Sequence, residues 1–173
     1  MPVFSVRQII PSTAASLVGL PELLFDVVHD GASVGFLAPL SPATAAAYWD
    51  GVYASLGDAL LLWVAESDGV AVGSVQLAPS MKQNGRHRAE VQKLLVLRAW
   101  RGRGVAKLLL AEAEAWARAH ARTLLVLDTE AGSVADSAYR RLGWQDVGGI
   151  PGYAAGTDGA LRANRIFYKR LTP

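Results

Sequence analysis

Cysteine is absent from this chain of 173 residues. Its absence excludes disulfide bonds, thiolate metal sites and a cysteine nucleophile, and it agrees with a reducing cytoplasm. Apolar runs are short, and none reaches the roughly 20 residues that a membrane-spanning helix needs. The net charge is low, because 17 basic residues nearly balance 15 acidic ones. We therefore expect a cytoplasmic protein that binds neither membranes nor nucleic acid.

Internal repeats and low-complexity linkers are also missing, so residues 1–173 are predicted to form a single domain. Hydrophobic residues make up 51% of the chain, which is enough for a sizeable core. The three histidines are scattered along the sequence and do not have metal-ligand spacing. No metal site is expected.

Hydrophobic periodicity predicts an α/β fold. Asp68-Gly69 indicates a tight hairpin turn, and residues 78–88 have the polar composition of a loop. A further loop rich in glycine and proline follows residue 150. Helices are expected at residues 21–29, 42–55, 105–120 and 133–142, and strands at 3–7, 60–66, 70–77, 89–97, 123–128, 144–150 and 166–171.

A glycine-rich segment joins the strand at 89–97 to the long helix that follows. Free backbone amides and the positive end of a helix dipole converge in such a segment, which is therefore suited to holding phosphate. It lacks the spacing of a nucleoside-triphosphate loop, and Lys107 stands where a dinucleotide fingerprint needs its third glycine. A third pattern, [Q/R]-x-x-G-x-[G/A], is matched in full by Arg101, Gly104 and Ala106.

This third pattern is the pyrophosphate loop of the GNAT superfamily of N-acetyltransferases, which the chain resembles. The segment from Tyr139 to Trp144 is similar to the superfamily's Y-x-x-L-G-F helix ending, and residues 73–77 fit its central hairpin. The resemblance covers nearly the whole chain. It implies a single-domain fold with a mixed, mostly antiparallel sheet flanked by helices, splayed central strands, and acetyl-CoA as cofactor.

Longer segments resemble the tabtoxin-resistance acetyltransferases within this superfamily. They comprise residues 90–94, 127–135 and 151–153 and the Asp158-Gly159 turn. This likeness implies acetyl transfer to the primary amine of a small amino-acid-like or toxin-like molecule, by direct attack on the thioester. A protein or peptide acetyltransferase and a non-catalytic acyl-CoA-binding regulator remain alternatives. Superfamily members often form homodimers, so a dimer is possible here.

The resemblance also assigns residues to the cofactor. The pyrophosphate is expected on backbone amides of the loop, and the pantetheine arm on main-chain groups of the preceding strand. At the start of the last helix, Gly132 replaces an asparagine common in the superfamily, and Ser133 is the expected substitute. The predicted cofactor-binding residues are Leu95, Val96, Leu97, Arg101, Gly102, Arg103, Gly104, Val105, Ala106, Lys107 and Ser133.

Three residues are candidates for the chemistry. An alkylammonium has a pKa near roughly 10 and must lose a proton before it attacks. Glu90 lies in an otherwise apolar strand and Asp128 ends the next one, so either carboxylate is a candidate base or ammonium ligand. Tyr139 matches the superfamily tyrosine that protonates the leaving thiolate.

The acceptor pocket is expected near the first two helices and the late glycine-rich loop. Phe36, Trp49 and Tyr53 are the aromatic candidates from the first region. Residues 152–159, with Tyr153, are expected to close over the acceptor.

Overall fold

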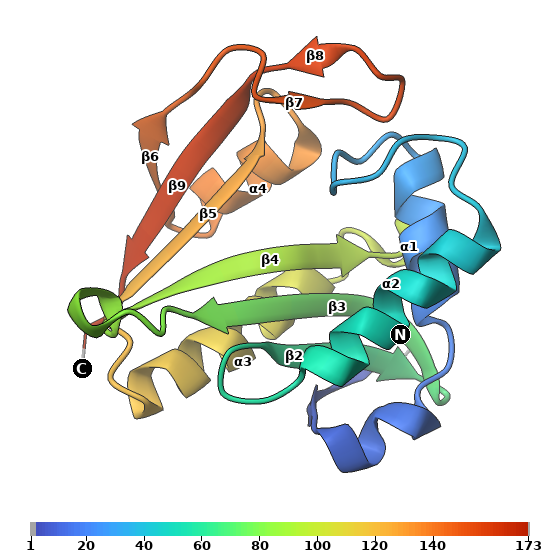
Figure 1. The fold of residues 1–173 in the computed structure, drawn as a ribbon, viewed down its shortest axis with the longest axis horizontal. Helices are drawn as coiled ribbons and strands as arrows, with labels where there is room; N and C mark the ends of the chain where they lie inside the picture. The colour runs from blue at the N-terminus through green and yellow to red at the C-terminus, as the bar shows by residue number, and fades with distance from the viewer. Residues whose placement is uncertain (1–2, 173) are drawn as a thin grey trace.

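The computed structural model describes residues 3–172 and is of the α/β class (Figure 1). Its first part comprises β1 (Ser5–Ile9), the 3₁₀ helix η1 (Pro11–Ser16), α1 (Leu20–His29), α2 (Pro42–Ser55), β2 (Leu61–Ser67), β3 (Val70–Pro79), η2 (Gln83–Gly85) and β4 (Arg88–Val96). The second part comprises η3 (Arg98–Trp100), α3 (Val105–Ala119), β5 (Leu124–Glu130), α4 (Val134–Arg141), β6 (Gln145–Gly148), β7 (Ala154–Ala155), β8 (Leu161–Arg162) and β9 (Asn164–Arg170).

Within the described residues, seven strands form one sheet in the order β1-β2-β3-β4-β5-β9-β6. Its neighbouring strands are antiparallel except for β4 and β5, which run parallel. The β4–β5 register ends with the pair Glu90–Val126, the third in the ladder, and the two strands then diverge. Figure 1 shows the resulting V, which is open toward the C-terminal ends of both strands. The expectation of splayed central strands is confirmed.

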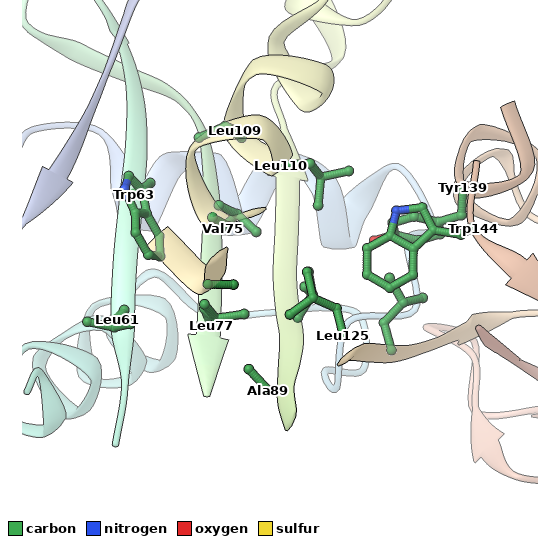
Figure 2. Close-up of a cluster of buried hydrophobic side chains, with 14 of the residues drawn as sticks. Leu61, Trp63, Val75, Leu77, Ala89, Leu109, Leu110, Leu125, Tyr139 and Trp144 are labelled. Atoms are coloured by element: carbon green, nitrogen blue, oxygen red, sulfur yellow. The ribbon is translucent and has the colours of Figure 1, made fainter. Parts of the chain in front are cut away.

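Alternating side chains of the sheet pack into two hydrophobic cores, one on each face. On β2, Trp63 belongs to the core beneath α3, whereas Leu62 and Val64 belong to the core beneath α1 and α2. The core on the α3 face continues across the sheet to β5 and α4 (Figure 2). The other core ends at Leu95 of β4, so its helices leave the opposite face of β5 open to a ligand.

Most predicted elements are confirmed with small shifts at their ends. Asp68 and Gly69 both have positive φ, 50° and 77°, as a tight hairpin turn requires. The first strand begins at Ser5 instead of Val3, and β3 extends to Pro79. The expectation of an unstructured loop after residue 150 was wrong in one respect: β7 and β8 form a small hairpin there. Strands of two residues are too short to produce a periodic pattern.

One acidic side chain of α3 is buried and paired. Glu114 accepts a hydrogen bond from Lys169 of β9 at 2.6 Å. It also contacts Arg118, four residues further along the helix, at 3.4 Å. Because the buried carboxylate contacts two cations, it holds α3 against the far side of the sheet without an unpaired charge. No helix in residues 3–172 is long and apolar enough to cross a membrane.

Candidate active site

The glycine-rich segment forms an open turn of exposed backbone ahead of α3. Gly102 and Gly104 have φ values of 74° and 85°, a conformation that side-chain-bearing residues rarely adopt. Gly104 is the N-cap of α3, and no side chain caps the helix there. Within residues 3–172, the amides of residues 102–107 donate to no backbone carbonyl, and the first such bond is Leu108 to Gly104. These unpaired donors fit a pyrophosphate.

The basic side chains around this turn differ in whether they form ion pairs. Arg101 is held by Asp30, at the end of α1, at 2.5 Å. Arg98 also pairs with Asp30, at 3.3 Å, and its backbone amide donates to Asp26 at 2.9 Å. Arg103 and Lys107 are exposed, and Arg103 lies 5.2 Å from the Trp100 ring centre. Positive charge at the turn therefore comes from Arg103 and Lys107, while Arg101 ties the turn to α1.

The strand that precedes the turn has a free edge. Beyond Glu90, β4 pairs with β3 but with no other strand in the described part of the chain. Its last residues, Val96 and Leu97, remain connected to β3, since the Leu97 amide donates to the Val72 carbonyl at 3.0 Å. The Leu95 side chain is buried, so only its main chain is available to a ligand. This geometry fits the expected main-chain pairing with a pantetheine arm.

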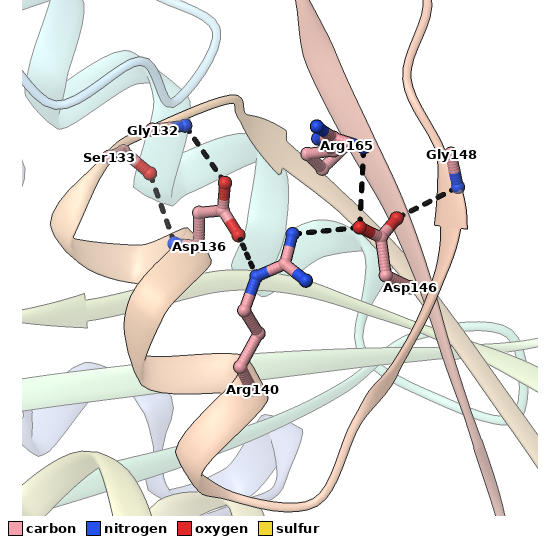
Figure 3. Close-up of polar contacts among 7 residues, drawn as sticks. All are labelled: Gly132, Ser133, Asp136, Arg140, Asp146, Gly148 and Arg165. Atoms are coloured by element: carbon pink, nitrogen blue, oxygen red, sulfur yellow. Dashed lines mark hydrogen bonds and ion pairs between the residues drawn. The ribbon is translucent and has the colours of Figure 1, made fainter.

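The start of α4 is fixed by a network of charged groups (Figure 3). Ser133 is the N-cap of α4 and accepts from the Asp136 amide at 3.1 Å. The Asp136 carboxylate accepts from the Gly132 amide at 2.8 Å and from Arg140 at 2.9 Å. In a capping box the third helical residue accepts from the N-cap amide, whereas here Asp136 accepts from the amide of Gly132, one residue earlier. Arg140 continues the network to Asp146 of β6 at 2.7 Å.

Asp146 makes this network sensitive to acid. The Arg140 hydrogen bond, with help from the Gly148 amide and Arg165, lowers the pKa of Asp146 below its ordinary value of 3.8. A lowered pKa adds stability above the unfolded-state value, and this stability is lost as pH falls through the folded-state value. We expect the Asp146→Asn variant to melt below the wild type at pH 7, and the gap to close below pH 3.8. Thermal melts from pH 7 to pH 2.5 test this, and a constant gap would contradict it.

Tyr139 lies at the edge of the main core, beside Trp144 (Figure 2). Its ring packs edge-on against Trp144 at 5.7 Å and contacts Phe167 at 6.0 Å. Burial, and secondarily the charge of Asp128, raises the pKa of Tyr139 well above its usual value. The hydroxyl therefore keeps its proton at neutral pH. In the described structure it makes no internal hydrogen bond, so it is available to a ligand.

Both candidate carboxylates are exposed on the open face of the V. Asp128 accepts from Asn164 of β9 at 3.5 Å, and the Asn164 oxygen accepts from the Ile150 amide at 3.0 Å. Glu90 accepts from Gln92 at 2.9 Å. Glu90 lies on β4, the otherwise apolar strand in which it was expected, and its side chain is exposed because α1 and α2 do not cover β4 at that point. Sequence reasoning missed Asn164, which β9 brings to Asp128 from 36 residues away.

The aromatic candidates for the acceptor pocket separate into two groups. Trp49 is fully buried in the core beneath α1 and α2, and Tyr53 lies half-buried at the edge of that core. Neither reaches the open face of the V. Phe36 packs edge-on against Tyr48 at 5.3 Å, and the Tyr48 hydroxyl accepts from Gln76 of β3 at 2.9 Å. Tyr48, the neighbour of Trp49, thus contacts both the loop between α1 and α2 and strand β3.

Two cavities flank the carboxylates. One, of about 30 Å³, is lined by residues that include Asp128, Tyr153 and Ser33. The other, of about 440 Å³, is lined by Glu90 and Val126 together with the segment from Ala78 to Lys82. The first is enclosed by the β7–β8 hairpin and the loop between α1 and α2. The second has the size of a small-molecule site.

The sequence of residues 23–144 matches the acetyltransferase (GNAT) family. This chain belongs to that family. The enzyme is an acetyl-CoA-dependent N-acetyltransferase, and the free amides of the turn after β4 agree with that cofactor. In residues 3–172 no three side chains of the metal-binding types gather closely enough to hold a metal ion.

Several solved structures share the fold of the acetyltransferase. A protein from Salmonella typhimurium, assigned as an acetyltransferase and solved with its cofactor acetyl-CoA, has a TM-score of 0.74 at 17% identity, over 98% of this chain and 94% of its own. A ribosomal-protein-alanine N-acetyltransferase from Brucella melitensis has a TM-score of 0.73 at 22% identity, over 96% and 99%. A protein assigned as a phosphinothricin N-acetyltransferase has a TM-score of 0.74 at 19% identity, over 99% and 100%.

Gly104 offers a direct test of the cofactor turn. An alanine at φ +85° costs roughly 1–2 kcal/mol, so the Gly104→Ala turn relaxes away from the conformation that gathers the free amides. We expect the Kd for acetyl-CoA to rise about 5- to 30-fold, measured by calorimetry. Gly69→Ala is the matched control, since Gly69 has φ +77° in the β2–β3 hairpin, remote from the turn. An equal rise in Kd for both variants would contradict the assignment.

Proposed function

We propose that this acetyltransferase moves the acetyl group to the primary amine of a small amino-acid-like molecule, with antibiotic-like or toxin-like compounds as the leading class. The resemblance of residues 90–94 and 127–135 to the tabtoxin-resistance acetyltransferases supports this class. A small-molecule acceptor is also named for one of the structures of similar fold, the one assigned to phosphinothricin.

The observation that carries this proposal is a closure across the open end of the V. The loop between α1 and α2 meets the β7–β8 hairpin, where the Ala38 amide donates to the Thr157 carbonyl at 2.8 Å. Figure 1 shows the hairpin and this loop side by side above the splayed strands. An extended peptide would need an open groove along this face, whereas a small amine fits an enclosed site.

Bound acetyl-CoA supplies the activated thioester, which we propose the acceptor amine attacks directly. Asp128, with Glu90 as the second candidate, takes the ammonium proton, directly or through water. Asn164 donates to the Asp128 carboxylate and so orients it. Tyr139 keeps a proton at neutral pH that it donates to the departing sulfur. No covalent enzyme intermediate is needed, in keeping with the absence of cysteine.

The test is acetyl-CoA turnover, read as released thiol, against a panel of amino acids, β-lactam amino-acid toxins, aminoglycosides, polyamines and short peptides. A small amine among the substrates, with acetylation confirmed by mass spectrometry, would support the proposal. Turnover confined to peptides would overturn it in favour of a protein acetyltransferase. Acetyl-CoA binding without turnover of any amine would favour a non-catalytic regulator.

A further inference from the structure

Lys93 occupies an unusual backbone position on β4. Between the pairs Ser74–Leu95 and Gln76–Gln92, β3 has one residue and β4 has two, Lys93 and Leu94, so the strand bulges. Lys93 has φ +48°, the left-handed conformation that glycine usually supplies in such bulges. A lysine held there is strained, and strain of this kind gathers at functional sites. The position therefore calls for an explanation in terms of the side chain.

The Lys93 side chain is half-buried and reaches from β4 to the loop between α1 and α2. Its ammonium nitrogen is 5.8 Å from the centre of the Tyr48 ring. It also lies close to Gly35 in the loop between α1 and α2, where an added Cβ would be 3.6 Å from it. In the described residues, no carboxylate oxygen comes within 4.0 Å of it and it makes no hydrogen bond. Among residues 3–172, this half-buried cation therefore has a ring contact but no ion-pair or hydrogen-bond partner.

The charges around Lys93 are the two candidate catalytic carboxylates. Burial lowers the pKa of the Lys93 ammonium, while the charges of Asp128 and Glu90 oppose that shift. The site therefore presents one cation, Lys93, beside Tyr48, and two anions, Asp128 on β5 and Glu90 on β4. An acceptor whose ammonium lies by Asp128 would place a carboxylate of its own near Lys93. This arrangement is complementary to a zwitterion and repels a polycation.

We propose that Lys93 binds the carboxylate of the acceptor, which makes the acceptor an amino acid or a close analogue with a free acid group. This inference rests on the proposed function and narrows it. It excludes polyamines and aminoglycosides, which carry several positive charges and no acid group. It also assigns Tyr48 and Gly35 to the binding site. The ring face of Tyr48 contacts the Lys93 ammonium, and Gly35, which has no side chain, leaves room beside that ammonium.

The experiment compares amino acids with their carboxamides as acceptors, using glycine and glycinamide, β-alanine and β-alaninamide, and methionine and methioninamide. Rates are referred to the concentration of unprotonated amine, because an amide lowers the pKa of the neighbouring amino group. We expect kcat/KM for the acids to exceed that for the amides by about 10- to 100-fold. In Lys93→Met the ratio should fall to near one, through a higher KM for the acid.

Two further variants separate charge recognition from folding. Lys93→Arg keeps the cation and should retain most of the preference for the acid. Arg170→Met removes an exposed cation at the end of β9, outside the site, and should leave the ratio unchanged. A wild-type enzyme that accepts amides as well as acids, or a Lys93→Met variant with an unchanged ratio, would overturn the inference while the proposed function stood. Failure to acetylate any amine would overturn both.

Discussion

We expect the Tyr139→Phe variant to lose kcat by about 10²-fold or more, with little change in the Kd for acetyl-CoA. The substitution removes one hydroxyl and keeps the ring that packs against Trp144 and Phe167. Without that proton donor the sulfur must leave as a thiolate, which raises the barrier by about 2.7 kcal/mol for each 100-fold loss. Steady-state kinetics with the amine found by the panel, and calorimetry with acetyl-CoA, measure the two quantities.

The pH profile adds a second reading of the same residue. Because burial raises the pKa of Tyr139, its hydroxyl should not titrate before pH 10, and the wild-type kcat should show no alkaline loss there. Tyr53→Phe is the matched control, since Tyr53 is a half-buried tyrosine at the edge of the other core. A Tyr139→Phe variant with normal kcat and weakened cofactor binding would make Tyr139 a cofactor contact only.

The second large effect concerns Asp128. Asp128→Asn keeps the size of the side chain and its contact with Asn164 but removes the proton acceptor. We expect kcat/KM for the amine to fall on the order of 10²- to 10³-fold near pH 7. The loss should shrink as pH rises, because more of the amine is then already unprotonated. Rate profiles from pH 6 to pH 10 measure this.

Glu90→Gln separates the two carboxylates. Glu90 is exposed, contacts Gln92 and lines the larger cavity, whereas Asp128 lies near Tyr139 in the V. We therefore place the base at Asp128 and expect Glu90→Gln to raise KM for the amine more than it lowers kcat. The reverse pattern, a collapse of kcat in Glu90→Gln with Asp128→Asn nearly normal, would exchange the two roles.

Local signals in the sequence were sufficient for most of the fold. Gly102 and Gly104 mark the turn, Ser133 marks a helix start, and Asp68-Gly69 marks a hairpin, because each acts on its own backbone or on that of residues close in sequence. The short β7–β8 hairpin has a turn signal in Asp158-Gly159, but its two-residue strands are too short to show a periodic pattern. It is held by contacts such as Ala38 to Thr157, which join residues far apart in the chain.

The residues on the acceptor side were harder to predict, because this requires knowing which side chains of a helix point into the core and which point away from it. Tyr48 and Trp49 are adjacent on α2, and the alanine-rich helix has too weak an apolar pattern to show which of them turns inward. The structure buries Trp49 and places Tyr48 over the V. Asn164 and Asp30 were likewise hidden, since each acts on a residue tens of positions away, Asp128 and Arg101 respectively.

The short ladder between β4 and β5 also ties the lifetime of the protein to its cofactor. With three residue pairs, it is as short as the β6–β9 ladder at the sheet edge, but it lies in the middle of the sheet, so the parts of the chain on either side of it are natural units of partial opening. A ligand that bound between β4 and β5 beyond Glu90 would replace the backbone hydrogen bonds that the two strands do not make there. When the free ligand concentration is 100 times the Kd, ligand binding adds about 2.7 kcal/mol to the free energy of unfolding. Bound acetyl-CoA should therefore make the purified enzyme more resistant to proteolysis between β4 and β5.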